Sequence, residues 1–202
     1  MIRAVVSDLG RVVLWFDNAI FLRRLAERSG RSFDDVKAAV HGDLELIRRF
    51  DGGAVTPAAF HARVMEIAGA DIPYGEFYEI YNDIFSLNRP AVDVLARVKA
   101  AGYGALLLSN TDPERFAFVR RRFPEIMFFD HYVLSYELKL LKPDPAIYLE
   151  AARRAGCVPS ECVFIDDMED NVKGAVEAGL AGVVYLPETD LAAELRKLGL
   201  RF

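Results

Sequence analysis

The stretch AVVSDLGRVVL, residues 4–14, places a carboxylate directly after a short apolar run. Three further apolar runs follow it, ALLL (105–108), CVFI (162–165) and GVVY (182–185), and each is bounded by Asp, Ser, Gly or Pro. Short runs without polar alternation are typical of strands that are buried on both faces of a parallel sheet. The sequence therefore predicts an α/β fold built on a parallel sheet.

Helical patterns separate the later runs and predict helices on both faces of this sheet. The segment 142–156, KPDPAIYLEAARRAG, begins with prolines and ends at a glycine, an asymmetry that is typical of helices. A helix after residue 189 is expected to carry Leu191, Leu195 and Leu198 on one side. The stretch 123–138, FPEIMFFDHYVLSYEL, is compatible with one strand or with two.

Residues 17–85 have a different pattern, without a convincing buried strand. Four segments carry a starting cap, a stopping glycine or both, and they are NAIFLRRLAERSG (18–30), SFDDVKAAVHG (32–42), TPAAFHARVMEIAG (56–69) and YGEFYEIYNDIF (74–85). The sequence predicts a helical insertion of roughly 70 residues between the first strand and the rest of the sheet.

Composition narrows the function classes. The chain has 202 residues, 52% of them hydrophobic, and a formal net charge of -5. This charge gives no overall field that would attract nucleic acid or an anionic membrane. No apolar run reaches the roughly 18 residues of a membrane span, and no leader pattern is visible, so a cytoplasmic protein is expected. Cys157 and Cys162 form no disulfide framework or zinc pattern.

Polar side chains follow the predicted strands at the point where each strand ends. They are Asp8, Ser109, Asn110, Asp166 and Asp167, and Lys142 precedes a predicted helix. Each has an ordinary structural interpretation as a cap, a strand-end hydroxyl or a solvated charge. Because ligands bind at the carboxyl ends of parallel strands, however, their joint placement favours one site.

Three carboxylates at this edge, Asp8, Asp166 and Asp167, would repel one another without a cation among them. The cluster therefore implies Mg²⁺ or a close ion pair with Lys142. Either cation would neutralise the oxygens of an incoming phosphoryl group while a carboxylate accepts it. The residues thus indicate an enzyme of phosphoryl transfer.

Four ordered motifs carry a family resemblance. They are DLGRVV (8–13), LLLSNTD (106–112), LKPDP (141–145) and VFIDDMEDN (163–171), with the helical insertion after the first. They resemble the motifs of the haloacid dehalogenase (HAD) superfamily over essentially the whole chain. The pattern is similar to that of bacterial sugar-phosphate phosphatases and of the phosphatase domain of soluble epoxide hydrolases.

The resemblance implies a Rossmann-like core of residues 1–16 and 86–202, and a C1-type helical cap of residues 17–85 that closes over the substrate. It also implies that Asp8 is the nucleophile and forms an aspartyl-phosphate. Ser109 and the region of Asn110 would hold the phosphoryl oxygens.

The same resemblance implies a charge-neutralising role for Lys142, which would also orient Asp8. Mg²⁺ would be bound by Asp8, by Asp167 and by the backbone carbonyl of Gly10. Gly10 would also contact the substrate. Asp166 would pair with Lys142, and Asn171 would support the site. The implied substrate is a small phosphorylated metabolite, and the protein would be a monomer or a homodimer.

Gly10 departs from the family pattern, because most phosphatases of the superfamily have a second Asp there that protonates the leaving group and later activates water. Loss of such a group typically costs about 10² to 10⁴ in rate. Either another group or a water transfers the proton, or the leaving group departs without much help. We therefore hypothesise a preference for phosphate esters with good leaving groups, with water attack on the phosphoenzyme limiting turnover.

Three alternatives remain to be weighed. A 2-haloacid dehalogenase would use Asp8 on carbon and need no metal, but the pair Asp166 and Asp167 is easiest to explain with a cation. A phosphomutase would need an acid at position 10 to transfer protons, so Gly10 disfavours this alternative. A catalytically weak scaffold that binds a phosphorylated ligand or a protein is the alternative that Gly10 favours.

Other residues carry weaker signals. His41, His61 and His131 are isolated and are expected on the surface or in the core. Trp15 and Phe16, just beyond the nucleophile, are expected either to line the pocket or to pack in the core.

Overall fold

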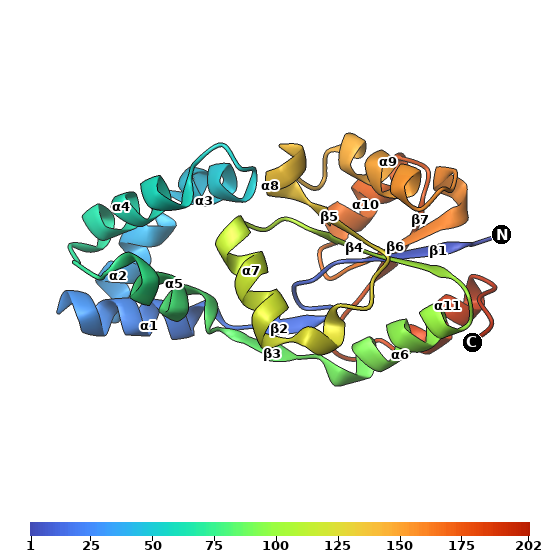
Figure 1. Ribbon diagram of the computed structural model, residues 1–202, viewed down its shortest axis with the longest axis horizontal. Coiled ribbons are helices and arrows are strands. Elements are labelled where there is room, and N and C mark those ends of the chain that lie inside the picture. Colours follow the sequence, from blue (N-terminus) through green and yellow to red (C-terminus); the bar gives the residue numbers. More distant parts are fainter.

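A five-stranded sheet forms the centre of the protein, in a computed structural model that describes residues 1–202 (Figure 1). Its strands are β1 (Ala4–Ser7), β4 (Gly104–Ser109), β5 (His131–Leu134), β6 (Cys162–Asp166) and β7 (Ala181–Val184). They lie in the order β5-β4-β1-β6-β7, and every neighbouring pair is parallel. The predicted α/β fold with a parallel sheet is confirmed.

Helices cover both faces of the sheet (Figure 1). One face packs against α6 (Arg89–Ala100) and α11 (Leu191–Lys197), and the other packs against α9 (Pro145–Arg154) and α10 (Glu169–Glu177). Successive strand residues point to opposite faces, so Val5 belongs to the first apolar core while Val6 belongs to the second. Both cores exclude water, which explains why the strands read as continuous apolar runs.

The stretch 123–138 contains one strand, β5, and not two. A 3-10 turn, η1 (Pro124–Ile126), precedes this strand, and the four-residue helix α8 (Ser135–Leu138) follows it. Helix α7 (Pro113–Arg122) connects β4 to this region. The 3-10 turn η2 (Pro159–Glu161) leads into β6.

Residues 18–82 form five helices on one side of the sheet (Figure 1). They are α1 (Asn18–Ser29), α2 (Phe33–His41), α3 (Leu44–Asp51), α4 (Pro57–Ala68) and α5 (Tyr74–Asn82). Side chains of Asp17, Ser32, Asp43 and Thr56 cap four of them. These helices share an apolar cluster of their own, in which the rings of Phe50 and Phe60 stack at 4.1 Å. Helix α3 lies in a stretch for which the sequence pattern gave no element.

A two-stranded antiparallel ribbon joins the helical region to the sheet. It consists of β2 (Leu14–Phe16) and β3 (Phe85–Leu87), with Trp15 opposite Ser86. The sequence analysis did not predict this ribbon. Because the chain leaves the core along β2 and returns along β3, the ribbon fixes where the helical region begins and ends.

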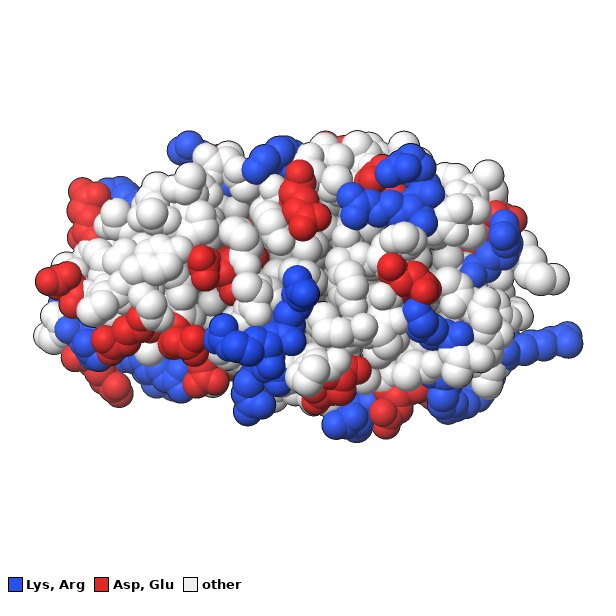
Figure 2. All heavy atoms as spheres, in the orientation of Figure 1, with Lys and Arg blue, Asp and Glu red and all other residues white.

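The helical region and the sheet also meet along α5 and α7. Figure 2 shows Lys and Arg side chains over α7 beside Asp and Glu side chains over α5. Arg121 of α7 binds Glu79 of α5 at 2.7 Å, and the Tyr74 hydroxyl donates to Glu114 at 2.8 Å.

No helix is both long enough and apolar enough to span a membrane.

Candidate active site

A cavity of about 310 Å³ lies at the carboxyl ends of β1, β4 and β6. Strand β1 is central, and the chain adds strands first on one side of it and then on the other, so this edge is where ligands of such sheets bind. The predicted site residues that line the cavity are Asp8, Gly10, Ser109, Asn110, Lys142, Asp167 and Asn171. Asp166 lies behind them, fully buried.

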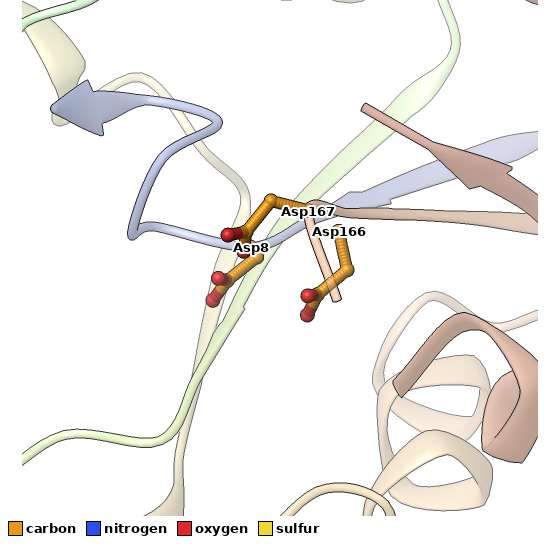
Figure 3. Close-up of side chains that lie close together, drawn as sticks. All are labelled: Asp8, Asp166 and Asp167. Carbon is orange, nitrogen blue, oxygen red and sulfur yellow. The ribbon is translucent and has the colours of Figure 1, made fainter. Parts of the chain in front are cut away.

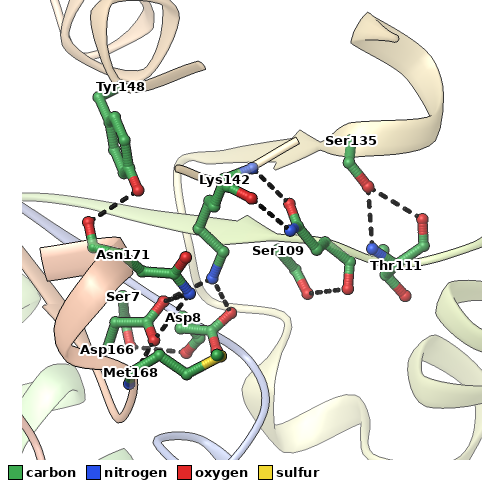
Figure 4. Close-up of polar contacts among 11 residues, drawn as sticks. Ser7, Asp8, Ser109, Thr111, Ser135, Lys142, Tyr148, Asp166, Met168 and Asn171 are labelled. Carbon is green, nitrogen blue, oxygen red and sulfur yellow. Dashed lines mark hydrogen bonds and ion pairs between the residues drawn. The ribbon is translucent and has the colours of Figure 1, made fainter. Parts of the chain in front are cut away.

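Lys142 contacts two carboxylates at once (Figure 4). Its Nζ lies 2.7 Å from Oδ1 of Asp8 and 2.6 Å from Oδ2 of Asp166. Burial alone would lower the pKa of Lys142, but the two carboxylates raise it above its usual value. The lysine therefore keeps a positive charge beside Asp8.

Asp166 is held by four hydrogen bonds (Figure 4). It accepts one from Lys142, one from the backbone N–H of Met168 at 2.8 Å and two from Nδ2 of Asn171 at 3.1 Å. The hydroxyl of Tyr148 in turn donates to the carbonyl of Asn171 at 2.7 Å. With both oxygens occupied, Asp166 fixes the position of Lys142.

Asp8 is anchored through its backbone, where its N–H donates to the carbonyl of Ile165 at 2.8 Å and its carbonyl accepts from Ser7 Oγ at 2.9 Å. Burial raises the pKa of Asp8, and the ammonium of Lys142 opposes this effect. Lys142 contacts Oδ1 of Asp8, which leaves Oδ2 for a substrate.

The carboxylates suit a divalent cation. Oxygens of Asp8, Asp166 and Asp167 lie within 4.8 Å of one another (Figure 3). The cations beside these three carboxylates are Lys142 and the more exposed Arg11, whose Nε lies 3.7 Å from Asp167. Burial and the neighbouring Asp166 raise the pKa of Asp167, as expected for excess negative charge. The carbonyl of Gly10 accepts no hydrogen bond from the protein. Because Asp166 is already satisfied, the oxygens that fit Mg²⁺ are those of Asp8, Asp167 and Gly10.

Ser109 and Asn110 are brought to the cavity in different ways. Ser109 Oγ lies 3.4 Å from the carbonyl of Asn110. The amide of Asn110 binds the backbone of Lys142, donating to its carbonyl at 3.1 Å and accepting from its N–H at 2.8 Å. The side-chain amide of Asn110 thus supports the segment that carries Lys142, and the expectation that Asn110 contacts the substrate stays a prediction. Its backbone N–H has no protein acceptor.

Thr111 was missed by sequence reasoning although it lies in the same motif. Its hydroxyl is buried, has no hydrogen-bond partner and belongs to a residue that lines the cavity. Buried hydroxyls without a partner are rare, and one at this position suits an anionic ligand.

Phe16 lines the cavity, whereas the neighbouring Trp15 packs against the sheet core. A Cβ atom at Gly10 would lie 3.0 Å from Cε1 of Phe16. The phenyl ring therefore stands beside the place where the usual second carboxylate would begin. Arg11 also lines the cavity, with its guanidinium 5.1 Å from the Phe16 ring and its Nε 3.7 Å from Asp167.

Asp51 at the end of α3 and Arg115 in the first turn of α7 complete the wall, and sequence reasoning missed both. Asp51 precedes a glycine pair and Arg115 follows a helix start, so each looks like an ordinary polar residue. No local pattern could have indicated them, because the packing of the helical region against α7 brings them to the site.

Comparison with known proteins identifies the family of the chain. The family model of haloacid dehalogenase-like hydrolases matches residues 5–179, and the chain belongs to this family. The resemblance predicted from the four motifs is confirmed.

Two curated relatives show how much of the chain is shared with named enzymes. A phosphorylated carbohydrates phosphatase of Thermotoga maritima is 26% identical over 188 residues, which cover 90% of this chain and 85% of that protein. The bifunctional epoxide hydrolase 2 of Rattus norvegicus is 28% identical over 138 residues, covering 64% of this chain. The matched segment spans 24% of that hydrolase, and other curated relatives are matched over a similarly small part of their length.

The arrangement of the whole chain is shared with a HAD family enzyme from Bacteroides thetaiotaomicron, whose crystal structure holds magnesium and inorganic phosphate. The TM-score is 0.85 at 26% identity, with 97% of this chain and 100% of that chain covered.

Proposed function

We propose that this protein is a Mg²⁺-dependent phosphatase that hydrolyses a small phosphorylated metabolite through an aspartyl-phosphate. The observation that carries the proposal is the buried Lys142, which contacts Asp8 at 2.7 Å in a cavity that Asp167 also lines. Such an arrangement pairs a nucleophilic carboxylate with fixed positive charge for the phosphoryl oxygens. The relatives named as phosphatases support it.

The first chemical step belongs to Asp8. Its Oδ2 attacks phosphorus, the bond from phosphorus to the ester oxygen breaks, and that oxygen leaves with the bonding electrons. Lys142, the N–H of Asn110 and the hydroxyls of Ser109 and Thr111 hold the phosphoryl oxygens during this transfer. Bound Mg²⁺, held by Asp8, Asp167 and the carbonyl of Gly10, would supply further neutralisation of negative charge.

Water completes the reaction by attacking phosphorus of the aspartyl-phosphate, which breaks the bond to the Asp8 oxygen and releases inorganic phosphate. Gly10 offers no side chain to protonate the leaving oxygen or to deprotonate this water. Esters whose leaving group is a weak base, such as an anomeric sugar phosphate, are therefore the preferred substrates of the proposed enzyme.

The helices of residues 17–85 are the proposed cap. Asp51 from α3 and Ile84 from the stretch after α5 line the same cavity as Asp8, so a substrate bound at Asp8 contacts this region as well. Closure of such a region would exclude water and complete the site. A phosphorylated carbohydrate is the substrate class that the name of the Thermotoga maritima phosphatase favours.

The test is release of phosphate from p-nitrophenyl phosphate and from a panel of sugar phosphates, with Mg²⁺ or with EDTA. Asp8→Asn should abolish phosphate release. Acid quenching of the wild-type protein during turnover should trap a phosphoryl group bound to the chain. Asp83→Asn, at an exposed carboxylate that pairs with Arg24, serves as the control.

Two results would redirect the proposal. Halide release from a 2-haloacid in the presence of EDTA would establish the dehalogenase. Binding of inorganic phosphate without a phosphoenzyme from any substrate would establish a binding scaffold.

A further inference from the structure

A second charged cluster lies on the wall of the same cavity and is used by no step above. It consists of Asp51, Asp112 and Arg115, hereafter the Arg115 cluster. Asp51 ends α3, Asp112 caps the start of α7, and Arg115 lies in the first turn of α7. Asp51 and Arg115 line the cavity that contains Asp8. The cluster therefore joins the helical region to the sheet beside the phosphoryl site.

The charged groups of the Arg115 cluster are poorly satisfied. Oδ1 of Asp51, Oδ2 of Asp112 and Nε of Arg115 are buried without a hydrogen-bond partner, and Asp112 is 0% exposed. Nε of Arg115 lies 3.8 Å from Oδ2 of Asp112, which is beyond hydrogen-bond distance. Unpaired buried groups of this kind are costly, and at a cavity wall they indicate a ligand that completes them.

The cluster is nevertheless held rigidly. The guanidinium of Arg115 lies 4.4 Å from the centre of the Tyr81 ring. The carbonyl of Asp51 accepts from Ser135 Oγ at 2.6 Å, and the same hydroxyl accepts from the N–H of Thr111 at 2.9 Å. Asp51 is thereby tied to the turn that carries Ser109 and Thr111, so a ligand with its phosphate at that turn places its next atoms near Asp51.

The chemistry of the cluster selects among ligands. Asp51 and Arg115 are the members that line the cavity, so a ligand there meets one carboxyl group that accepts hydrogen bonds and one guanidinium that donates them. This pair suits the hydroxyl groups of a carbohydrate. A second phosphate or a carboxylate would compete with Asp51 and Asp112 for the single guanidinium of Arg115. An apolar group would leave the three atoms unpaired. Burial, which raises the pKa of Asp51 to about 7, also allows this group to donate a proton to a hydroxyl oxygen.

We infer that the Arg115 cluster is a specificity subsite that binds the hydroxyl groups of a carbohydrate monophosphate and disfavours a second anionic group. The inference rests on the proposed phosphatase function. It names residues that select the substrate, and two of them, Asp112 and Arg115, lie outside the helical region.

The experiment compares kcat/KM of the Mg²⁺-loaded full chain for four probes: the anomeric phosphates glucose 1-phosphate and mannose 1-phosphate, glucose 1,6-bisphosphate, and p-nitrophenyl phosphate, which has no hydroxyl groups. The wild-type protein should prefer at least one monophosphate to the bisphosphate. Asp51→Asn should lower kcat/KM for that monophosphate by about 10- to 100-fold, since hydrogen bonds to charged groups are the strong ones. Its effect on p-nitrophenyl phosphate should stay below about 3-fold.

Arg115→Lys is the second variant, because it keeps the charge but loses the planar donors, and the same selective loss is expected. Arg121→Met is the matched control, since Arg121 lies on the same helix and binds Glu79 of α5 but does not line the cavity. Both monophosphates should be cleaved by this control as by the wild type.

Each remaining outcome overturns the inference. Equal losses for the monophosphate and for p-nitrophenyl phosphate would mean that the cluster only supports the fold. Wild-type cleavage of p-nitrophenyl phosphate without cleavage of either monophosphate would remove the subsite but leave the phosphatase. Absence of phosphate release from all four probes would instead overturn the proposed function itself.

Discussion

Two charged clusters border one cavity, and each combines one cation with two carboxylates. In the first, Lys142 contacts Asp8 and Asp166 at 2.7 and 2.6 Å. In the second, Arg115 lies 3.8 Å from Asp112, and three polar atoms of the cluster have no partner. In the first cluster the cation is paired with both carboxylates at hydrogen-bond distance, whereas in the second the Nε of the cation has no hydrogen-bond partner in the protein.

The two clusters differ in whether the protein itself supplies the partners of their charged groups. Lys142 is surrounded by groups that the fold itself positions, so its charge is set before a substrate arrives. The Arg115 cluster carries the cost of unpaired polar atoms in the free protein. Preorganisation is expected for the group that acts on phosphorus, and incomplete satisfaction is expected for the group that recognises a variable part of the substrate.

The largest effect should come from breaking the first cluster with Lys142→Met. Asp8 and Asp166 would then be buried without a cation, and the free energy of unfolding should fall by about 3–5 kcal/mol. We also expect kcat/KM to fall by about 10³-fold, because a fixed positive charge at the phosphoryl site is lost. Phosphate release and urea unfolding measure the two effects.

Lys99→Met is the control for this variant, because Lys99 forms an exposed pair with Asp130 away from the cavity. Turnover by Lys142→Met within 10-fold of the wild-type rate would contradict the role of Lys142.

The second cluster can be probed through the pH dependence of stability. Burial raises the pKa of Asp51 from 3.8 to about 7 in the folded protein. Between these values the folded state binds more protons than the unfolded state, so this group's contribution to stability is lost as pH rises from about 4 to 7. Asp51→Asn removes that loss.

The free energy of unfolding of Asp51→Asn, minus that of the wild type, should therefore increase between pH 4 and pH 8. We expect an increase of roughly 2–4 kcal/mol, since one pKa unit corresponds to about 1.4 kcal/mol. Urea unfolding in EDTA at both pH values measures it. Asp83→Asn, at an exposed carboxylate, should show no such change. A pH-independent difference for Asp51→Asn would mean that Asp51 is not strained by burial.

The sheet and the first cluster were predictable because their signals are local. The apolar runs at 4–6, 105–108 and 162–165 identify strands that water does not reach, and a parallel sheet brings the residues after them to one edge. That geometry and the need to balance charge left open whether Mg²⁺ or Lys142 faces the carboxylates. The resemblance to the HAD motifs supplied the pairing of Lys142 with Asp166, which are 24 residues apart.

The other parts depend on packing that no local pattern records. The β2 and β3 strands have three residues each, too few for a periodic signal. Asn110 was identified as a site residue, but the direction of its amide, toward the backbone of Lys142, is set by the loop after α8. The Arg115 cluster arises where α3 meets α7, which are separated by more than 60 residues in the chain.

Asn110 tests how far the first cluster depends on its support. Asn110→Ala removes both hydrogen bonds to the backbone of Lys142 and keeps the backbone N–H of residue 110. At about 1 kcal/mol for each bond, we expect kcat/KM to fall about 10- to 30-fold. Steady-state kinetics at saturating Mg²⁺ measures the change.

Asn88→Ala is a matched control, because the buried amide of Asn88 also makes two hydrogen bonds, to Val12 and Tyr185, outside the site. It should lose stability and keep its kcat/KM. Loss of stability alone in Asn110→Ala would assign Asn110 a structural role.

The smallest effect is expected from placing a carboxylate at position 10, beside Asp8, where most phosphatases of the family have one. In Gly10→Asp the new Cβ meets Cε1 of Phe16 at 3.0 Å, so the ring must shift by a few tenths of an ångström while it packs against Phe85, whose ring centre lies 6.0 Å away. We expect kcat/KM for alkyl phosphates to rise by up to about 10-fold relative to p-nitrophenyl phosphate, well below the full effect of a positioned acid. The double variant with Phe16→Leu, which gives the carboxylate room, should show the larger gain. An unchanged ratio in both variants, with Mg²⁺ affinity intact, would mean that another group at this cavity already supplies the proton.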